Sequence, residues 1–415
     1  MTAKKKRLQA QPRSRIMSTC FTQERGLREQ CNKKICRLLI AVDFVFLLLF
    51  LSGCYESYSL LLKLGSLVLS FGCFLSVSWN SRTPGWIWGY LSLIALFLFT
   101  QYVYTSFKYH QSISQFFFAS YYFVFSLLIP VFFYLLNEAG LNKVLTNLEL
   151  LISVISGYML LMAFTYITFG VNLTEITRFR GGLLRINAPF IVQLGCVVAA
   201  YLFACGKGQK KLHALTWLLS FFAILLVYQS RLIILLLSFI FLYIFALRNR
   251  GNAGASYIAV LFALIVFLLL CSVGPLEGIL SSFSVTGDHA GSTLTRIYEI
   301  EYYLDLFQEL PLNGVGLIPF GSAQYSLLSG PFNNFYIDDV GIIGALAEIG
   351  LWVFLIYIVP MIVLTFRSFC RKSHIPKLLA TAILFYLLGT TFTTLIAFPY
   401  FDPTWAFCLA LLAFE

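Results

Sequence analysis

The sequence predicts an all-α, polytopic membrane protein. Hydrophobic residues make up 59% of the chain and charged residues only 11%, whereas soluble domains carry about 25% charged residues. The mean hydropathy is +0.84. Apolar runs recur along all 415 residues, and each is close to the ~20 residues that a helix needs to cross ~30 Å of hydrocarbon. Most of the surface of such a chain is expected to face lipid.

The apolar runs predict about twelve transmembrane helices. The first run, at 38–53, has no small-residue cleavage site and is followed by further spans, so we interpret it as an anchor and not as a removable signal peptide. The twelve spans are expected to begin near Leu38, Ser59, Gly85, Gln115, Asn147, Ala188, Leu212, Arg231, Ala255, Val340, Pro376 and Pro403.

The distribution of basic residues predicts the orientation. Eleven of the 29 Lys and Arg residues lie in residues 1–37, which we interpret as a basic cytoplasmic segment; residues 38–415 form one transmembrane domain. With the N-terminus inside, 22 basic residues fall on the cytoplasmic side and six outside, as the positive-inside rule requires. The +11 net charge therefore predicts contact with membrane lipids and no nucleic-acid partner.

Two outer loops differ from the short connections. The first covers 170–187. The second covers about 275–339, between the ninth and tenth spans, and holds eight of the 18 acidic residues. A structureless loop of that length is uncommon. The periodicity of STLTRIYEIEYYLDLFQEL predicts an amphipathic helix at about 292–310, with Pro311 as its stop. Its predicted apolar face holds Leu294, Ile297, Ile300, Leu304, Phe307 and Leu310.

Four arginines lie on the predicted outer side, although most basic residues fall on the cytoplasmic side. Arg178, Arg180 and Arg185 fall in the first outer loop, and Arg231 opens the eighth span. The rigid guanidinium fork suits phosphate, and helix N-termini at the same face favour anions. One interpretation is that the arginines snorkel to the lipid headgroups. We favour a bound anionic ligand, a pyrophosphate.

Carboxylates at the predicted tenth span form a second candidate site. Asp338 and Asp339 precede the span, and Glu348 lies nine residues further on, about 14 Å deeper in a continuous helix. A carboxylate at that depth usually marks a functional site. The aspartates could instead cap the helix. Tyr336 is a further polar group on this side.

Other motifs offer less. His289 could be catalytic or simply solvated. The glycines of LPLNGVGLIPFG follow no strand, which disfavours a nucleotide site. The ten cysteines form no CxxC pair, and no cluster of metal ligands is present in the sequence. We expect neither a cofactor nor a metal, so an activated substrate would supply the energy of any reaction.

Together these features resemble the O-antigen polymerase and O-antigen ligase superfamily, bacterial membrane glycosyltransferases that use lipid-linked glycans. RFRGGLLRINAPF leads into one span, Ser230-Arg231 opens another, and a long loop runs from Arg296 through PLNGVG. DDVGIIGALAEIGL then carries Glu348 and Gly350 as a Glu-x-Gly. The resemblance covers roughly residues 175–352. Ligases of the superfamily typically have a His-Asn pair nine residues before that Glu, where this chain has Asp339, which favours a polymerase.

The resemblance implies a GT-C-like fold in the bacterial cytoplasmic (inner) membrane, with a metal-independent active face on the periplasmic or extracellular side. Undecaprenyl-pyrophosphate-linked glycans would be donor and acceptor. Asp339, Glu348 and Arg296 would act in catalysis and the four outer arginines would bind pyrophosphate. A chain-length regulator and a flippase would be partners. Two alternatives remain open: transfer of glycan to lipid A core or protein, and a lipid-linked oligosaccharide flippase or transporter.

Overall fold

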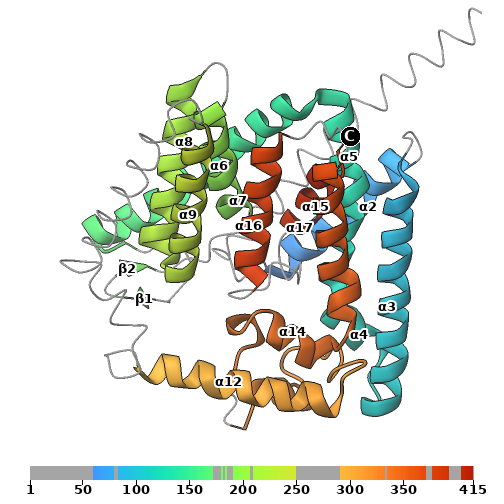
Figure 1. The fold of residues 1–415 in the computed structure, drawn as a ribbon. Coiled ribbons are helices and arrows are strands. Elements are labelled where there is room, and N and C mark those ends of the chain that lie inside the picture. The colour runs from blue at the N-terminus through green and yellow to red at the C-terminus, as the bar shows by residue number, and fades with distance from the viewer. Residues whose placement is uncertain are drawn as a thin grey trace, which may run out of the picture.

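The computed structural model describes residues 59–78, 83–171, 179–180, 183–184, 190–205, 209–248, 290–331, 334–370, 376–391 and 403–414. Within these ranges the chain is almost entirely helical, which agrees with an all-α membrane protein (Figure 1). The sheet found there is a two-residue hairpin in which β1, Phe179–Arg180, pairs antiparallel with β2, Leu183–Leu184.

The helices of the first half are α2 (Ser59–Ser78), α3 (Gly85–Tyr109), α4 (Ile113–Ser120), η2 (Tyr121–Leu127), α5 (Leu128–Ala139), α6 (Leu141–Phe169), α7 (Phe190–Cys205), α8 (Lys210–Phe222), η3 (Ala223–Tyr228) and α9 (Arg231–Arg248). Those of the second half are α12 (Ala290–Glu309), η5 (Ala323–Tyr325), α13 (Ser326–Ser329), η6 (Ile337–Asp339), α14 (Ile342–Ile349), η7 (Phe354–Ile358), α15 (Val359–Cys370), α16 (Lys377–Thr391) and α17 (Thr404–Leu412).

The predicted count of twelve spans is wrong for the part of the chain that the structure describes. Four helical segments there are long and apolar enough to cross a membrane: Gly85–Tyr109, Ile113–Ala139, Leu141–Phe169 and Lys210–Tyr228. Other apolar helices are shorter, such as Phe190–Cys205 and Lys377–Thr391. Hydropathy finds apolar runs but not helix breaks, and a break divides the predicted tenth span at Gly350, where φ is +62°. The first and ninth predicted spans lie outside the described residues.

The centre of the bundle is α7. Nearly all of its side chains are buried, and it packs against α6, α8, α9 and α16. Gly195 allows α6 to approach closely, because a Cβ atom there would collide with the side chain of Ile152. Helices that pass close together in membranes often use such small residues at the contact.

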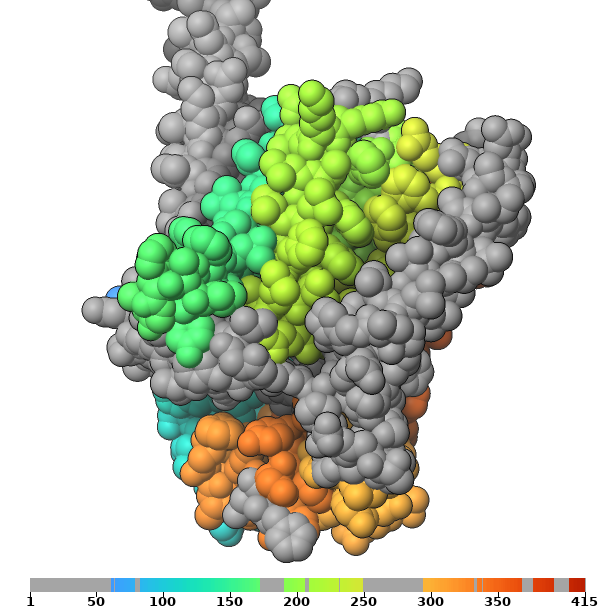
Figure 2. Space-filling view, turned by 90° about the vertical axis from the view of Figure 1, so that its left-hand side faces the viewer, coloured from blue at the N-terminus to red at the C-terminus, as the bar shows by residue number. Residues whose placement is uncertain are grey.

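A separate layer covers one end of this bundle. In Figure 1, α12 and α14 lie across the lower ends of the long helices, and Figure 2 shows them at the bottom of the molecule. The layer has its own apolar core, built around Tyr303, Leu328, Phe335 and Ala347. We call this side of the molecule the α12 end. The hairpin β1–β2 and the connection between α3 and α4 lie toward the same end.

The helix predicted at about 292–310 is confirmed as α12, and the protein covers its predicted apolar face only in part. Leu294, Ile297 and Leu304 are exposed, whereas Glu299 and Tyr303 are buried. Glu299 and Tyr303 are four residues apart and therefore share one side of the helix. This side packs against α14, so α12 turns an acidic residue toward the protein.

Candidate functional site

The two motifs PLNGVG and AEIG fit together at the α12 end. The backbone N–H groups of Val315 and Gly316 donate to the carbonyl oxygens of Ala347 and Glu348, at N···O distances of 2.8 and 2.7 Å. The N–H of Leu351 donates to Pro311 O at 2.9 Å. The loop after α12 is thereby hydrogen-bonded to the last turn of α14.

Glycines make this contact possible. Gly314 and Gly350 both have φ of +62°, a conformation that costs glycine little. A Cβ atom on Gly314 would lie 2.5 Å from the carbonyl oxygens of Ala347 and Glu348. The glycines of PLNGVG therefore allow two backbone segments to lie close together. They are not part of a phosphate-binding loop that leads into a helix.

The same loop is tied to the long helix α3. The side-chain amide of Gln101 donates to Asn313 O at 3.1 Å, and the hydroxyl of Tyr104 donates to Gly314 O at 3.0 Å. The α12 layer is thus held to the bundle through polar contacts between a buried glutamine and the loop backbone.

Glu348 does not lie nine residues inside a continuous transmembrane helix, as the sequence predicted. Helix α14 begins only at Ile342, because Gly341 (φ +57°) separates it from the 3-10 turn η6, which holds Asp339. Glu348 is 3% exposed, in the turn of α14 that contacts the loop. Its depth therefore cannot be counted as a helical rise from Asp339.

The two aspartates do not cap α14. Its N-cap residue is Gly341, which has no side chain to cap the first turn. Asp338 and Asp339 instead belong to the 3-10 turn η6, which Gly341 (φ +57°) separates from the helix. Asp339 is exposed, so this carboxylate is accessible at the surface of the α12 end.

Glu299 is the functional candidate that sequence reasoning missed. It lies on α12 and is 1% exposed. The backbone N–H of Tyr336, just before η6, donates to Glu299 Oε1 at 3.2 Å. Glu299 Oε2 is buried and has no hydrogen-bond partner among the described residues. A buried carboxylate oxygen without a partner is costly.

The surroundings of Glu299 change its protonation. Burial raises the pKa of the Glu299 carboxyl to about 7; the Tyr336 N–H opposes this, the negative charge of Asp339 adds to it, and the Arg296 guanidinium opposes it. Two neighbouring carboxylates, one of them with a pKa near neutrality, are an arrangement found at catalytic sites. Of the predicted residues, the structure brings Arg296, Asp339 and the Tyr336 backbone together around Glu299; the Tyr336 side chain is 62% exposed.

The predicted arginine site is described only in part. Arg180 ends β1, and β2 packs against α6 and η3. After η3, Gln229 adopts a left-handed conformation (φ +57°) and α9 begins at Arg231, as predicted. The strand that holds Arg180 and the helix that Arg231 opens are thus linked through β2 and η3. Arg178, Arg185, His289 and the side chains of Arg180, Arg231 and Asp338 lie outside the described part of the structure.

Comparison of the sequence with models of known protein families and with curated proteins found no match. The resemblance to the O-antigen polymerase and ligase superfamily thus depends on the motifs themselves.

Proposed function

We propose that this chain is a membrane glycosyltransferase that polymerises undecaprenyl-pyrophosphate-linked oligosaccharide repeat units into a surface polysaccharide. The observation that carries the proposal is the acidic pair formed by exposed Asp339 and buried Glu299, which belongs to the same α12 end as the contact between PLNGVG and Glu-x-Gly. In this proposal the α12 end faces the outside of a bacterial cytoplasmic membrane, the bundle is GT-C-like, and the reaction uses no metal.

The proposed reaction is a displacement at the anomeric carbon of the donor. A hydroxyl oxygen of the acceptor sugar forms the new glycosidic bond, and the bond from the anomeric carbon to the pyrophosphate oxygen breaks. Undecaprenyl pyrophosphate leaves with the bonding electrons, and the hydroxyl proton passes to the enzyme. Because pyrophosphate is already a good leaving group, the protein has two tasks: to accept a proton and to stabilise an anion.

Asp339 is the proposed proton acceptor. Its carboxylate is exposed, so it can contact an acceptor hydroxyl. Glu299 is a positioning residue that acts through Asp339. Its Oε1 accepts the backbone N–H of Tyr336, and Tyr336 O accepts the backbone N–H of Asp339, so Glu299 holds the turn that carries Asp339. An ionised carboxylate accepts such a hydrogen bond more strongly than a neutral carboxyl does, so the site would work best when Glu299 is ionised.

The remaining predicted residues keep the roles expected from the sequence. Arg178, Arg180, Arg185 and Arg231 would hold the pyrophosphate and stabilise its growing charge. Arg296 lies three residues before Glu299 on α12, and its positive charge would offset the negative charge of the acidic pair. Helix α12 would cover the site and limit water, which would otherwise hydrolyse the donor. A chain-length regulator and a flippase would be partners.

Deletion of the gene in the source bacterium tests the proposal. Surface and lipid-linked glycans are compared on a gel with those of a complemented strain. Loss of the long-chain ladder, with single repeat units still reaching the surface, is the expected result. Polymer that accumulates on undecaprenyl pyrophosphate would indicate a ligase instead, and single units trapped inside would indicate a flippase. An unchanged profile would exclude a role in glycan assembly.

A further inference from the structure

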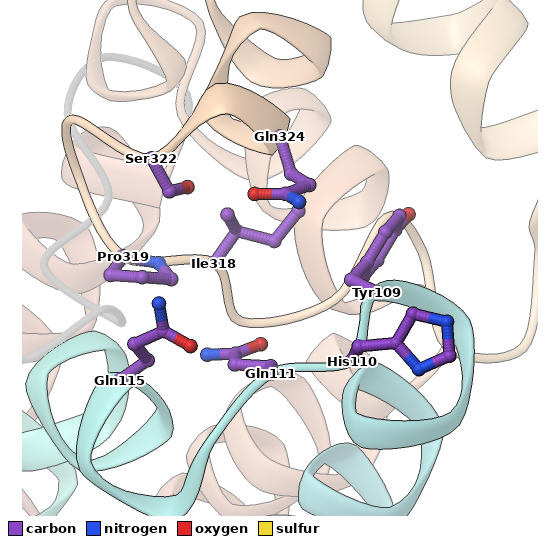
Figure 3. A pocket seen from close by; sticks show the side chains of 8 residues that line it. All are labelled: Tyr109, His110, Gln111, Gln115, Ile318, Pro319, Ser322 and Gln324. Atoms are coloured by element: carbon purple, nitrogen blue, oxygen red, sulfur yellow. The ribbon is translucent and has the colours of Figure 1, made fainter.

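A small polar pocket lies beside the loop that carries PLNGVG. It is formed between the connection from α3 to α4 and residues 318–324 (Figure 3). Its volume is about 180 Å³, well above the ~10–15 Å³ that a single water needs. In Figure 3, Gln111 and Gln115 extend into it from one wall, and Ser322 and Gln324 from the other. We propose that this pocket binds one neutral sugar unit of a glycan.

The buried atoms of the pocket lack partners. Gln111 is 6% exposed. Its Nε2 donates to Leu317 O at 3.2 Å, which fixes the orientation of the amide and turns Oε1 into the acceptor. Gln111 Oε1 and Ser322 Oγ are both buried without a hydrogen-bond partner among the described residues. Leaving such buried atoms unpaired is unfavourable, so the pocket favours a polar occupant.

The pocket also offers a hydrogen-bond donor. Gln115 Oε1 accepts from the backbone N–H of Ser112 at 2.9 Å, as part of the cap of α4. The Gln115 amide therefore presents its N–H₂ group as a donor. The cavity thus combines an acceptor (Gln111 Oε1), a donor (the Gln115 amide) and a hydroxyl (Ser322). This combination matches adjacent sugar hydroxyls, because each sugar hydroxyl both donates and accepts hydrogen bonds.

The charge of the pocket selects a neutral ligand. None of its lining residues is Asp, Glu, Lys or Arg. Lys108, close by in the sequence, directs its Nζ to the hydroxyl of Tyr104 at 2.8 Å. Phosphate sites generally use cationic side chains or helix N-termini. A sugar hydroxyl therefore fits this lining better than the pyrophosphate does.

The loop that lines the pocket also contacts α14. Gln111 holds Leu317, and the preceding residue, Gly316, is bonded to Glu348 O. The same loop thus forms a wall of the pocket and the contact with α14. Under the proposed function, which this step assumes, the bound unit is a sugar of the lipid-linked glycan.

Ligand-detected NMR on the full-length protein in nanodiscs tests the site. The probes are the methyl glycosides of glucose, galactose, rhamnose and N-acetylglucosamine, with inorganic phosphate as the anionic comparison. We expect at least one glycoside to bind and phosphate not to compete. Ser322→Ala and Gln324→Leu should each weaken binding about three- to tenfold, the equivalent of one hydrogen bond. Gln308→Leu, on the exposed face of α12, is the matched control and should bind like the wild type.

Thermal stability separates binding from folding. Ser322→Ala removes a buried hydroxyl that has no hydrogen-bond partner in the described part of the chain, so the melting temperature should not fall. Failure of every glycoside to bind, competition by phosphate, or unchanged binding in both variants would overturn the sugar site. These outcomes are independent of the gene deletion: sugar binding with an unchanged glycan ladder would refute only the polymerase, and a lost ladder without sugar binding would refute only the pocket.

Discussion

Glu149 on α6 and Glu299 on α12 are both buried, at 0% and 1% exposure, but their surroundings differ. His213 on α8 contacts both oxygens of Glu149, with Nδ1···O distances of 2.8 and 2.7 Å. Glu299 has a single backbone donor and one oxygen without a partner among the described residues. The first carboxylate is satisfied within the bundle, whereas the second is not.

The contact around Glu149 continues along the helices. One turn further on, Ser153 Oγ lies 2.7 Å from Thr216 Oγ1, and then Ser156 Oγ donates to Ser220 Oγ at 3.2 Å. Such interhelical hydrogen bonds hold helices together where lipid removes the hydrophobic driving force. The Glu149–His213 pair is therefore explained by helix association.

The difference between the two sites separates a structural role of a buried carboxylate from a chemical one. A carboxylate with a complete set of partners contributes to the fold, and its removal should affect stability. A carboxylate with an unused oxygen and a second acid beside it has a protonation state that small changes can shift. We expect removal of such a group to affect chemistry more than stability.

The largest expected effect is on the exposed member of the acidic pair. Asp339→Asn should lower the rate of chain extension at least about 100-fold, because an amide cannot accept the hydroxyl proton. The rate is measured with purified protein and lipid-linked repeat units. Asp305→Asn, an exposed aspartate on α12, is the matched control and should keep the wild-type rate. Full activity of Asp339→Asn would exclude Asp339 as the base.

The pair in the bundle should instead control stability. Glu149→Ala leaves His213 buried without its partner, and removal of one member of a buried pair typically costs about 3–5 kcal/mol. Thermal unfolding in detergent measures the loss, with exposed Glu301→Ala as the control. The double variant Glu149→Leu/His213→Leu should recover most of the lost stability, since no charge remains unpaired. A double variant as unstable as the single one would argue against the pair as a structural contact.

The contact between the two motifs should depend on its glycines. Gly314→Ala forces an alanine to φ of +62° and places Cβ 2.5 Å from backbone oxygens, so we expect a loss of about 1–3 kcal/mol. Gly157→Ala, within α6, meets no atom within 4 Å and should leave the melting temperature unchanged or raise it. Equal stability of the two variants would show that the loop does not need this close approach.

The smallest expected effect is the pH dependence of α12 packing. The pKa of Glu299 is raised from 4.5 to about 7 in the folded protein, so the folded state binds the proton more tightly. The resulting stabilisation is complete below the unfolded value and is lost as the pH rises through about 7. Hydrogen exchange of α12 should therefore become faster over this range. In Glu299→Gln the exchange, corrected for its intrinsic pH dependence, should stay constant; an unchanged pH response would mean that another group is responsible.

Sequence reasoning predicted the bounds of α12 but not the burial of Glu299. Helical periodicity and Pro311 gave its ends to within two residues. The apolar residues Leu294, Ile297 and Leu304 nevertheless face outward. The burial of Glu299 depends on η6, nearly forty residues later in the chain, and no local pattern contains that contact. The sequence did contain one indication: Tyr303 lies four residues after Glu299 and therefore shares its side of the helix.

The candidate site was predicted in the same partial way. Asp339 and Arg296 were identified, and both influence Glu299. The continuous helix assumed between Asp339 and Glu348 was wrong, because Gly341, whose φ is +57°, separates η6 from α14. PLNGVG was recognised as a motif, but its partner, the backbone of α14, is a tertiary contact that a glycine pattern cannot specify.

The most direct test of the acidic pair is the pH dependence of chain extension by the purified full-length protein, from about pH 5.5 to about pH 8.5. We expect the wild-type rate to rise with pH and to level off above an inflection near 7, as Glu299 ionises beside Asp339. In Glu299→Gln, which is neutral throughout, the rate should stay at the low-pH level without that inflection. The same inflection in wild type and variant would contradict the proposed pair.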